Sequence, residues 1–474
     1  MKAGESGNDV TQNNVTTKND TNTIITNQKT DKASSNTVTI EANGKNDKVE
    51  VTLKDVNIDT SSRNNAAVSV TGSGNTTIKL DGDNHLTGGI SDNGSYGLSG
   101  ISSSGSLTIS GGETDSLTAQ GGSGTDGSGG SGITSLGSLT ISGGTVNAAG
   151  GDGTNSSDGG DGITNNRGVT ISSGGTVTAK GGSGEDGSGG RGISSFGGVT
   201  ISSGGTVTAT GGNSTGSDGS GGDGISSTST TISGGTVTAD GGSGNFSGGN
   251  GIRSFDVAIS GGTVNVAGGN GGNGSGSDVG NGIYSSDIDL SGSLELTAKA
   301  GSPNGKALSQ RGNELDLDDI KDKLGPGAKV TAINANGDSK QVSIPRPVEP
   351  EEPVIPGDSS SSSGGGSADA SVQESVFPGL VVTDKDGQRI SYTSTQSGNT
   401  LTVCVGRFTA SLRISLATLR QLRAEGIDTI TFQTILCSTT LSVDELLAMG
   451  GEDAEIVLTH HIRSSTLTVG GKAV

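Results

Sequence analysis

Residues 163–192 read ITNNRGVTISSGGTVTAKGGSGEDGSGGRG, and residues 193–224 read ISSFGGVTISSGGTVTATGGNSTGSDGSGGDG. They are the clearest of seven copies of one unit, whose opening isoleucines stand 27 to 32 residues apart. A repeat with this period is typical of a solenoid, in which each copy forms one coil and stacks on the next. The opening isoleucines are Ile101, Ile133, Ile163, Ile193, Ile225, Ile252 and Ile283.

Apolar residues occupy fixed places within each copy. In the copy that opens at Ile163, Val169 and Ile171 form one pair and Val177 and Ala179 form a second. Each pair alternates with Thr or Ser, which is the period-two pattern of a strand with one buried face. About a dozen residues of Gly, Ser, Asp and Asn follow. The pattern predicts three short strands and one Gly-rich excursion per coil of a parallel β-helix.

Stacking the copies at a strand spacing of roughly 4.8 Å predicts continuous apolar columns inside the solenoid. One column follows the opening isoleucines, and a second contains Ile109, Ile141, Ile171, Ile201, Ile232, Ile259 and Leu290. A third contains Leu117, Val146, Val177, Val207, Val237, Val264 and Leu294. A disordered low-complexity tract is the competing interpretation, since 89 of 474 residues are Gly, but disorder does not require columns in register.

The solenoid is expected to cover residues 37–310, after an unstructured segment at residues 1–36. Residues 66–89 are interpreted as a divergent coil in which Val68 matches the opening Ile, Ile78 matches Ile109 and Leu86 matches Leu117. Residues 311–344 are predicted to cap the end of the solenoid with a helical turn and a hairpin around Asn336-Gly337.

A Pro/Ser/Gly linker is predicted at residues 345–371, and a small α+β domain at residues 372–474. Its two helices are expected to begin after Ser415 and at the capping box that starts with Ser442, and to end at Gly426 and Gly450. Its strands are expected at residues 380–383, 389–393, 401–405, 429–434 and 456–460. Cys404 and Cys437 fall on separate predicted strands, where they either pair or remain buried thiols.

Charge and composition exclude some classes of function and indicate where the protein is located. The formal net charge is −20, and such a surface would repel the phosphates of nucleic acid. No stretch approaches the roughly 20 apolar residues of a membrane span. The first residues, MKAGESGNDVTQNN, lack the apolar core of a signal peptide. Because Asn/Thr/Gly-rich solenoids are mostly exported, we expect an extracellular or cell-surface protein whose leader is missing from this chain.

The Gly-rich excursions carry candidate calcium ligands. GGSGTD at residues 121–126 and GGSGED at residues 181–186 are similar to the start of the calcium-binding nonapeptide repeat, although Ser128 and Ser188 replace its apolar residue. Stacked excursions would bring carboxylates towards one edge, and Ca²⁺ prefers such oxygen ligands. The candidates are Asp126, Asp158, Asp186 and Asp218. The alternative is that each Asp only favours a turn.

Neither catalysis nor ice binding is favoured. A polysaccharide lyase or hydrolase needs clustered carboxylates with Arg or Lys, whereas the outward positions are mostly Thr, Ser and Asn. Repeated triplets such as Thr176-Val177-Thr178 and Thr206-Val207-Thr208 look like an ice-binding Thr lattice, but outward Thr is also what any solvated strand prefers. The sequence therefore predicts a protein that is not an enzyme.

Residues 49–89 carry a family resemblance. The segments LKDVNI (53–58), AAVSV (66–70) and TTIKLDGDNHLTGG (76–89) resemble bacterial surface β-helix proteins described as carbohydrate-binding domain-containing. The resemblance extends over about residues 37–310. It implies a right-handed parallel β-helix, extracellular display, and affinity for acidic or plant polysaccharide with calcium.

Two hypotheses remain for the whole chain. The first is adhesion, or binding of polysaccharide or of glycan on a host surface, by the long surface of the solenoid. The second is a structural stalk that displays the C-terminal domain. The scattered aromatic residues Tyr96, Phe196, Phe246, Phe255 and Tyr284 favour no sugar-stacking platform, so no saccharide-binding residues are predicted.

Overall fold

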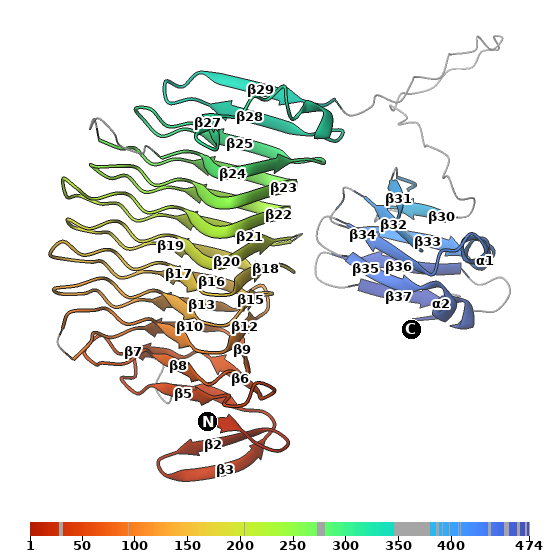
Figure 1. Cartoon of the computed structure of the whole chain (residues 1–474). Coiled ribbons are helices and arrows are strands. Elements are labelled where there is room, and N and C mark those ends of the chain that lie inside the picture. The colour runs from red at the N-terminus through yellow and green to blue at the C-terminus, as the bar shows by residue number, and fades with distance from the viewer. Residues whose placement is uncertain are drawn as a thin grey trace, which may run out of the picture. The chain divides into compact units, whose positions relative to one another are not determined.

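The computed structural model describes the chain except for residues 28–31, 93, 203, 273–279, 346–379, 385–387, 391, 398, 406, 408, 435–437, 450–454, 462–464, 470–471 and 474. It divides into two units, Met1–Glu352 and Pro353–Val474. The first unit is a parallel β-solenoid of about 12 turns, which confirms the predicted fold class (Figure 1). The predicted linker, 345–371, lies outside the described residues except for Pro345.

Three faces of parallel strands build each coil. The opening isoleucines and their equivalents lie on face 1, where successive strands pair in register, for example Ile133 with Ile163. Face 1 consists of β5 (Val38–Glu41), β8 (Val68–Thr71), β11 (Ile101–Ser103), β14 (Ile133–Ser135), β17 (Ile163–Asn165), β26 (Leu308–Gln310), and the first parts of β20 (Ile193–Ile201), β22 (Ile225–Asp240), β23 (Ile252–Ala267) and β24 (Ile283–Leu290).

Faces 2 and 3 follow within each coil. Face 2 consists of β4 (Ile24–Thr26), β6 (Lys48–Lys54), β9 (Asn75–Asp81), β12 (Ser106–Ser110), β15 (Leu139–Ile141), β18 (Gly168–Ile171) and the next parts of β20, β22, β23 and β24. Face 3 consists of β7 (Asn57–Asp59), β10 (Asp83–Thr87), β13 (Ser116–Gln120), β16 (Thr145–Ala149), β19 (Thr176–Lys180), β21 (Thr206–Thr210), the last parts of β22 and β23, β25 (Glu295–Lys299) and β28 (Lys329–Ile333).

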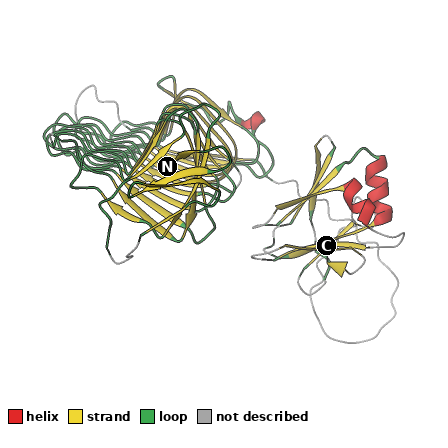
Figure 2. Ribbon diagram, turned by 90° about the horizontal axis from the view of Figure 1, so that it is seen from below, coloured by secondary structure: helices red, strands yellow, loops and turns green. Residues whose placement is uncertain are grey.

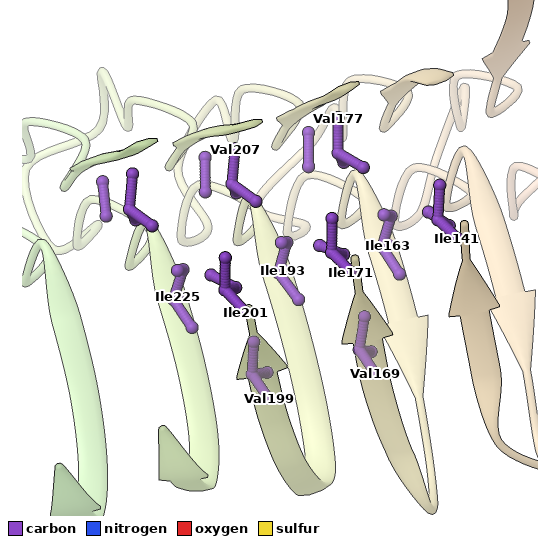
Figure 3. Close-up of a cluster of buried hydrophobic side chains, with 14 of the residues drawn as sticks. Ile141, Ile163, Val169, Ile171, Val177, Ile193, Val199, Ile201, Val207 and Ile225 are labelled. Carbon is purple, nitrogen blue, oxygen red and sulfur yellow. The ribbon is translucent and has the colours of Figure 1, made fainter. Parts of the chain in front are cut away.

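The predicted apolar columns form the core (Figure 3). Alternation in each strand turns one side inward, so that in β19 Val177 and Ala179 are buried between more exposed Thr and Lys residues. The column from Ile109 to Leu290 is confirmed by strand register. The Val177 column ends differently from the prediction, because Leu296 rather than Leu294 pairs with Val264.

In the divergent coil, the predicted matches of Val68 with Ile101 and of Ile78 with Ile109 are confirmed, but the third match is shifted by two residues. Leu86 pairs with Ala119, and the buried Asn84 stands opposite Leu117. The Asn84 side chain accepts a hydrogen bond from the Val56 amide and donates to the Ser116 carbonyl. These bonds replace the hydrogen bonds that the Asn84 amide would make to water, so the amide can occupy a core position. A comparison of coils by hydrophobic residues alone therefore aligns β10 with β13 in the wrong register.

A buried polar column lies where face 1 turns into face 2. Asn165 is its clearest member: its amide donates to the Ser135 and Gly137 carbonyls, and its Oδ1 accepts from the Arg167 and Gly168 amides. These bonds satisfy backbone groups of two coils at the turn. The buried residues of the column are Ser103, Ser135, Asn165, Ser195, Ser254 and Ser285.

The prediction that residues 1–36 are unstructured is wrong. β1 (Lys2–Ala3), β2 (Asn8–Gln12) and β3 (Val15–Asp20) form a capping element, and β4 pairs with β6 as an additional strand of face 2. The buried Asn8 side chain donates to the Glu50 carbonyl of β6. An open solenoid edge exposes unpaired backbone groups, and this polar hairpin covers them without an apolar pattern in the sequence.

The other end is capped as predicted. A 3-10 turn, η1 (Lys321–Lys323), follows the short β27 (Asn313–Glu314), and the buried Leu317, Ile320 and Leu324 pack on the core. β28 continues face 3 by one coil and forms an antiparallel hairpin with β29 (Ser339–Ser343) around Asn336-Gly337.

The second unit has two sheets and two helices, as expected for an α+β domain. One sheet contains β30 (Leu380–Thr383), β33 (Ala410–Ser415), β36 (Glu455–His460), β37 (Ser465–Val469) and β38 (Lys472–Ala473). The other contains β31 (Thr393–Ser397), β32 (Thr400–Cys404), β34 (Thr429–Gln433) and β35 (Ser438–Ser442). The helices are α1 (Leu416–Ala424) and α2 (Val443–Met449).

Both helix starts are confirmed, since Ser415 Oγ accepts from the Thr418 amide and Ser442 Oγ accepts from the Glu445 amide. The strand expected at 389–393 is wrong, because Arg389 forms an isolated bridge and β31 begins at Thr393. Cys404 is a free, half-buried thiol, and burial raises its pKa. Cys437 lies outside the described residues.

Candidate functional site: a polar groove beside the glycine-rich excursions

The Gly-rich excursions stack into a thin slab that projects from one side of the strand coils (Figure 2). Each excursion has an outgoing and a returning leg. Backbone hydrogen bonds join both legs to the next coil and to each other: the Gly160 amide donates to Gly151, the Gly182 amide to Gly160, and the Gly190 amide to Gly182, each over 2.8 Å. The slab is therefore ordered by its backbone, without an apolar core of its own.

Glycine is required where the two legs meet. A Cβ at Gly160 would lie 2.0 Å from the Gly130 carbonyl oxygen, and a Cβ at Gly190 would lie 1.9 Å from the Gly160 carbonyl oxygen. No side chain fits at such distances. The high Gly content thus reflects close backbone packing, not disorder.

A polar groove runs along the solenoid between the returning legs and face 1. Its volume is about 560 Å³. Two rows of equivalent positions from successive coils line it, the serine row and the junction row. The serine row contains Ser128, Asp158, Ser188, Ser220 and Ser247; the junction row contains Ser131, Asp161, Arg191, Asp223, Asn250 and Asn281, and Arg253 and Tyr284 of face 1 complete the lining.

Side chains of the junction row tie each coil to the next. Asp161 Oδ1 accepts from the Arg191 amide over 2.7 Å, and Asp223 Oδ1 accepts from the Asn250 amide over 2.7 Å. In the following coils the same bond is made by Asn250 Oδ1 with the Asn281 amide, over 3.0 Å. Carboxylate and amide are therefore interchangeable acceptors at this position.

Burial is the main influence on Asp161. Desolvation raises the pKa of this carboxyl above its usual range, while the Arg191 amide, the Arg191 charge and the Thr164 hydroxyl act in the opposite direction. The Asp223 carboxylate, also buried, lies 3.8 Å from the Arg191 guanidinium and accepts two bonds from Asn250. The charges in the centre of the groove are thus largely satisfied by neighbours.

The groove ends differ from its centre. Asp158 is exposed, and its Oδ1 accepts from the Ser188 amide over 2.7 Å. At the other end, Arg253 is exposed and pairs in register with Tyr284, which is 40% exposed. Among the described residues, neither Asp158 nor Arg253 forms an ion pair.

The four predicted calcium ligands occupy different settings. Asp158 lines the groove, whereas Asp126 accepts from the Asn155 amide group at the tip of an excursion. Asp186 and Asp218 are exposed. Within the described part of the chain, no group of three His, Cys, Asp or Glu side chains could hold a metal ion. Binding of calcium at these residues stays a prediction.

The outward Thr residues of face 3 form straight columns. Thr176, Thr206, Thr236 and Thr263 follow one another in register, because differences in coil length fall in the turns and excursions between the strands. Parallel pairing of the strands alone produces these columns, so their regularity does not favour ice or any other ligand.

Two of the solenoid aromatics share a position. Phe196 and Phe255 occupy the same turn position as Leu136 on alternate coils, and the three side chains are 75%, 67% and 48% exposed. Tyr284 instead lines the groove. The two locations offer different surfaces to a ligand, and substitutions can distinguish them.

The junction row was missed in the sequence. Its signal is a polar residue directly before each Gly-Ile pair, as in Asp161-Gly162-Ile163, Arg191-Gly192-Ile193 and Asp223-Gly224-Ile225. The residue type changes from coil to coil, which hides the position from a search for conserved motifs. The parallel strand register reveals the junction row, because it places the equivalent residues of successive coils next to one another.

Comparison of the chain with protein-family models, with curated proteins and with solved structures finds no match. Among the described residues, no helix has the length and apolar character to cross a membrane. The fold and site define a parallel β-solenoid with a polar groove along its axis.

Proposed function

We propose that the protein is a non-catalytic binding protein, displayed outside the cell or on its surface, whose groove holds an extended segment of polysaccharide. The observation that carries the proposal is the repetition of groove positions in register. From Ser131 to Asn281 the junction row takes five steps of roughly 4.8 Å, or about 24 Å in all. A polymer of repeating units can present an equivalent chemical group to the junction-row residue of each successive coil.

The chemistry of the lining supports a saccharide. Hydroxyl, amide, carboxylate and guanidinium groups alternate along the groove, and these are the partners that sugar hydroxyls use as donors and acceptors. The exposed Tyr284 ring adds an apolar face at one end, on which a sugar ring can stack. The net charge of −20 disfavours nucleic acid, the other common linear polymer.

A glycan array probed with the full chain, with and without Ca²⁺, tests the proposal. We expect binding to a defined set of oligosaccharides, and we expect Tyr284→Ala to weaken it roughly fivefold, as loss of about 1 kcal/mol of stacking implies. The matched control is Phe196→Ala, an exposed aromatic on another turn, which should bind like the unchanged chain.

Two outcomes would contradict the proposal. Absence of binding in both conditions would favour the structural stalk. New reducing ends or unsaturated sugars during incubation with the bound polysaccharide would show catalysis. Calcium-dependent binding that is lost in Asp126→Asn or Asp218→Asn would instead add the predicted calcium role to the binding function.

A further inference from the structure

Charge is unevenly distributed along the groove, and this bears on which saccharides the proposed binding function would accept. Asp158 places an exposed carboxylate one coil inside one end, and Arg253 places an exposed guanidinium one coil inside the other. Neither has a partner of opposite charge among the described residues. Both groups are therefore available to a ligand.

Between these ends, the one cation of the described lining, Arg191, stands between the carboxylates of Asp161 and Asp223, so the charges of the stretch have neighbours of opposite sign. Ser188, Ser220 and Ser247 follow Asp158 along the serine row, and the Arg191 guanidinium faces the buried Asp223 carboxylate at 3.8 Å. From Asp158 to Ser247 the row takes three steps, about 14 Å at the strand spacing. A bound saccharide would thus meet hydroxyls and backbone over several sugar units before it reached Arg253.

The guanidinium at Arg253 suits a carboxylate. Arg donates two parallel hydrogen bonds to a carboxylate, and Tyr284 stands beside it in register on the next strand. At the opposite end, the Asp158 carboxylate would repel an anionic sugar and so disfavour a polymer that carries a charge on every residue. Arg253 therefore attracts a sugar carboxylate, whereas Asp158 repels one.

We infer that the groove selects a saccharide with a single carboxylate, seated at Arg253, followed by neutral sugars across the serine row, and that it discriminates against uniformly charged polyuronates. This inference rests on the proposed function, and it assigns Arg253 and Asp158 as residues that determine specificity and ligand direction.

Three probes test it on the full chain by titration: a neutral oligosaccharide from the array, the same oligosaccharide with one terminal uronic acid, and polygalacturonate. We expect the singly charged probe to bind best. Arg253→Gln should lower its affinity roughly tenfold, as loss of one charge-assisted hydrogen-bonded pair implies, and should lower the affinity of the neutral probe much less. Asp158→Asn should increase binding of polygalacturonate.

Matched controls carry the same changes outside the groove. Arg167→Gln and Asp186→Asn alter exposed side chains of the same types and should change none of the three affinities. Equal binding of the neutral and singly charged probes, or tight binding of polygalacturonate by the unchanged chain, would overturn the inference. The proposed function would survive that result if Tyr284→Ala still weakened binding, and it would fail with the inference if no probe bound.

Discussion

Single residues of the junction row link one coil to the next at the base of the groove. Asp161 and Asn250 accept equivalent backbone hydrogen bonds, yet only Asp161 titrates. Burial raises its pKa in the folded chain, so the folded state binds the proton more tightly than the unfolded chain does. Its contribution to stability is therefore largest below the usual Asp range and falls as the pH rises through the interval up to the raised pKa.

Asp161→Asn should remove this pH dependence. The amide keeps the bond to the Arg191 amide, as Asn250 does for Asn281, so the variant should fold. We expect it to gain stability relative to the unchanged chain as the pH rises from roughly 3 through and above the ordinary Asp range. Free energies of unfolding from denaturant titrations across that range provide the measurement. A difference between the two proteins that stays constant with pH would show that Asp161 has no raised pKa.

Gly190 tests the packing of the slab. A Cβ at this position would collide with the Gly160 carbonyl, so Gly190→Ala should destabilise the solenoid by about 1–3 kcal/mol. Ser183→Ala on the outgoing leg is the control and should change stability by less than about 0.5 kcal/mol. Denaturant midpoints compare the two. Equal stabilities would mean that the legs do not pack backbone to backbone.

Asn165 tests the buried polar column. Asn165→Ala leaves two carbonyls and two amides of the turn without their partner, and should cost about 3 kcal/mol. Asn165→Ser should cost less, because serine holds this place at Ser135 and Ser195. Urea unfolding of both variants provides the test, and an alanine variant as stable as the serine variant would contradict the role of the amide.

Individual elements show why the ends of the solenoid were harder to predict than its middle. The repeated strands could be predicted because alternating Val, Ile and Thr encode one buried face, and their register follows from the repeat. The hairpin β2–β3 carries polar residues on both sides and is held through Asn8, so it has no period to detect. The register predicted for β10 was wrong for a related reason: the hydrogen-bonded amide of Asn84 occupies a core position that is apolar in the other coils.

The N-terminal hairpin should protect only the coils that it covers. Asn8→Ala removes the bond to the Glu50 carbonyl, and we expect amide exchange in β4 and β6 to accelerate about fivefold, as for a loss of ~1 kcal/mol. β19 should be unaffected, because stability in a solenoid is transmitted between neighbouring coils. Hydrogen exchange read by mass spectrometry distinguishes the segments, with the exposed Thr17→Ala as control. Uniform acceleration along the solenoid would contradict local capping.

On the scale of the whole molecule, the two units have separate cores. Leu419 is fully buried in the second core, so Leu419→Ala should destabilise that unit by about 2–5 kcal/mol and leave the solenoid unchanged. Arg420→Ala, exposed on the same helix, is the control. Hydrogen exchange of peptides from each unit gives both stabilities in one experiment. A parallel loss of protection in the solenoid would show that the units fold together.

The groove also belongs to this scale, because no single copy of the repeat contains it. The sequence predicted the excursions and proposed Asp158 as a ligand, but for calcium. It did not predict the rows that the excursions and face 1 form together, since residues about 30 positions apart become neighbours only after stacking.

The most direct test of the account is a crystal structure of the full chain with the oligosaccharide that binds best on the array. We predict that the saccharide lies along the serine and junction rows, with its end near Arg253 and Tyr284. Saccharide bound over Leu136, Phe196 and Phe255, or on the Thr columns of face 3, would contradict the assignment of the groove as the binding site.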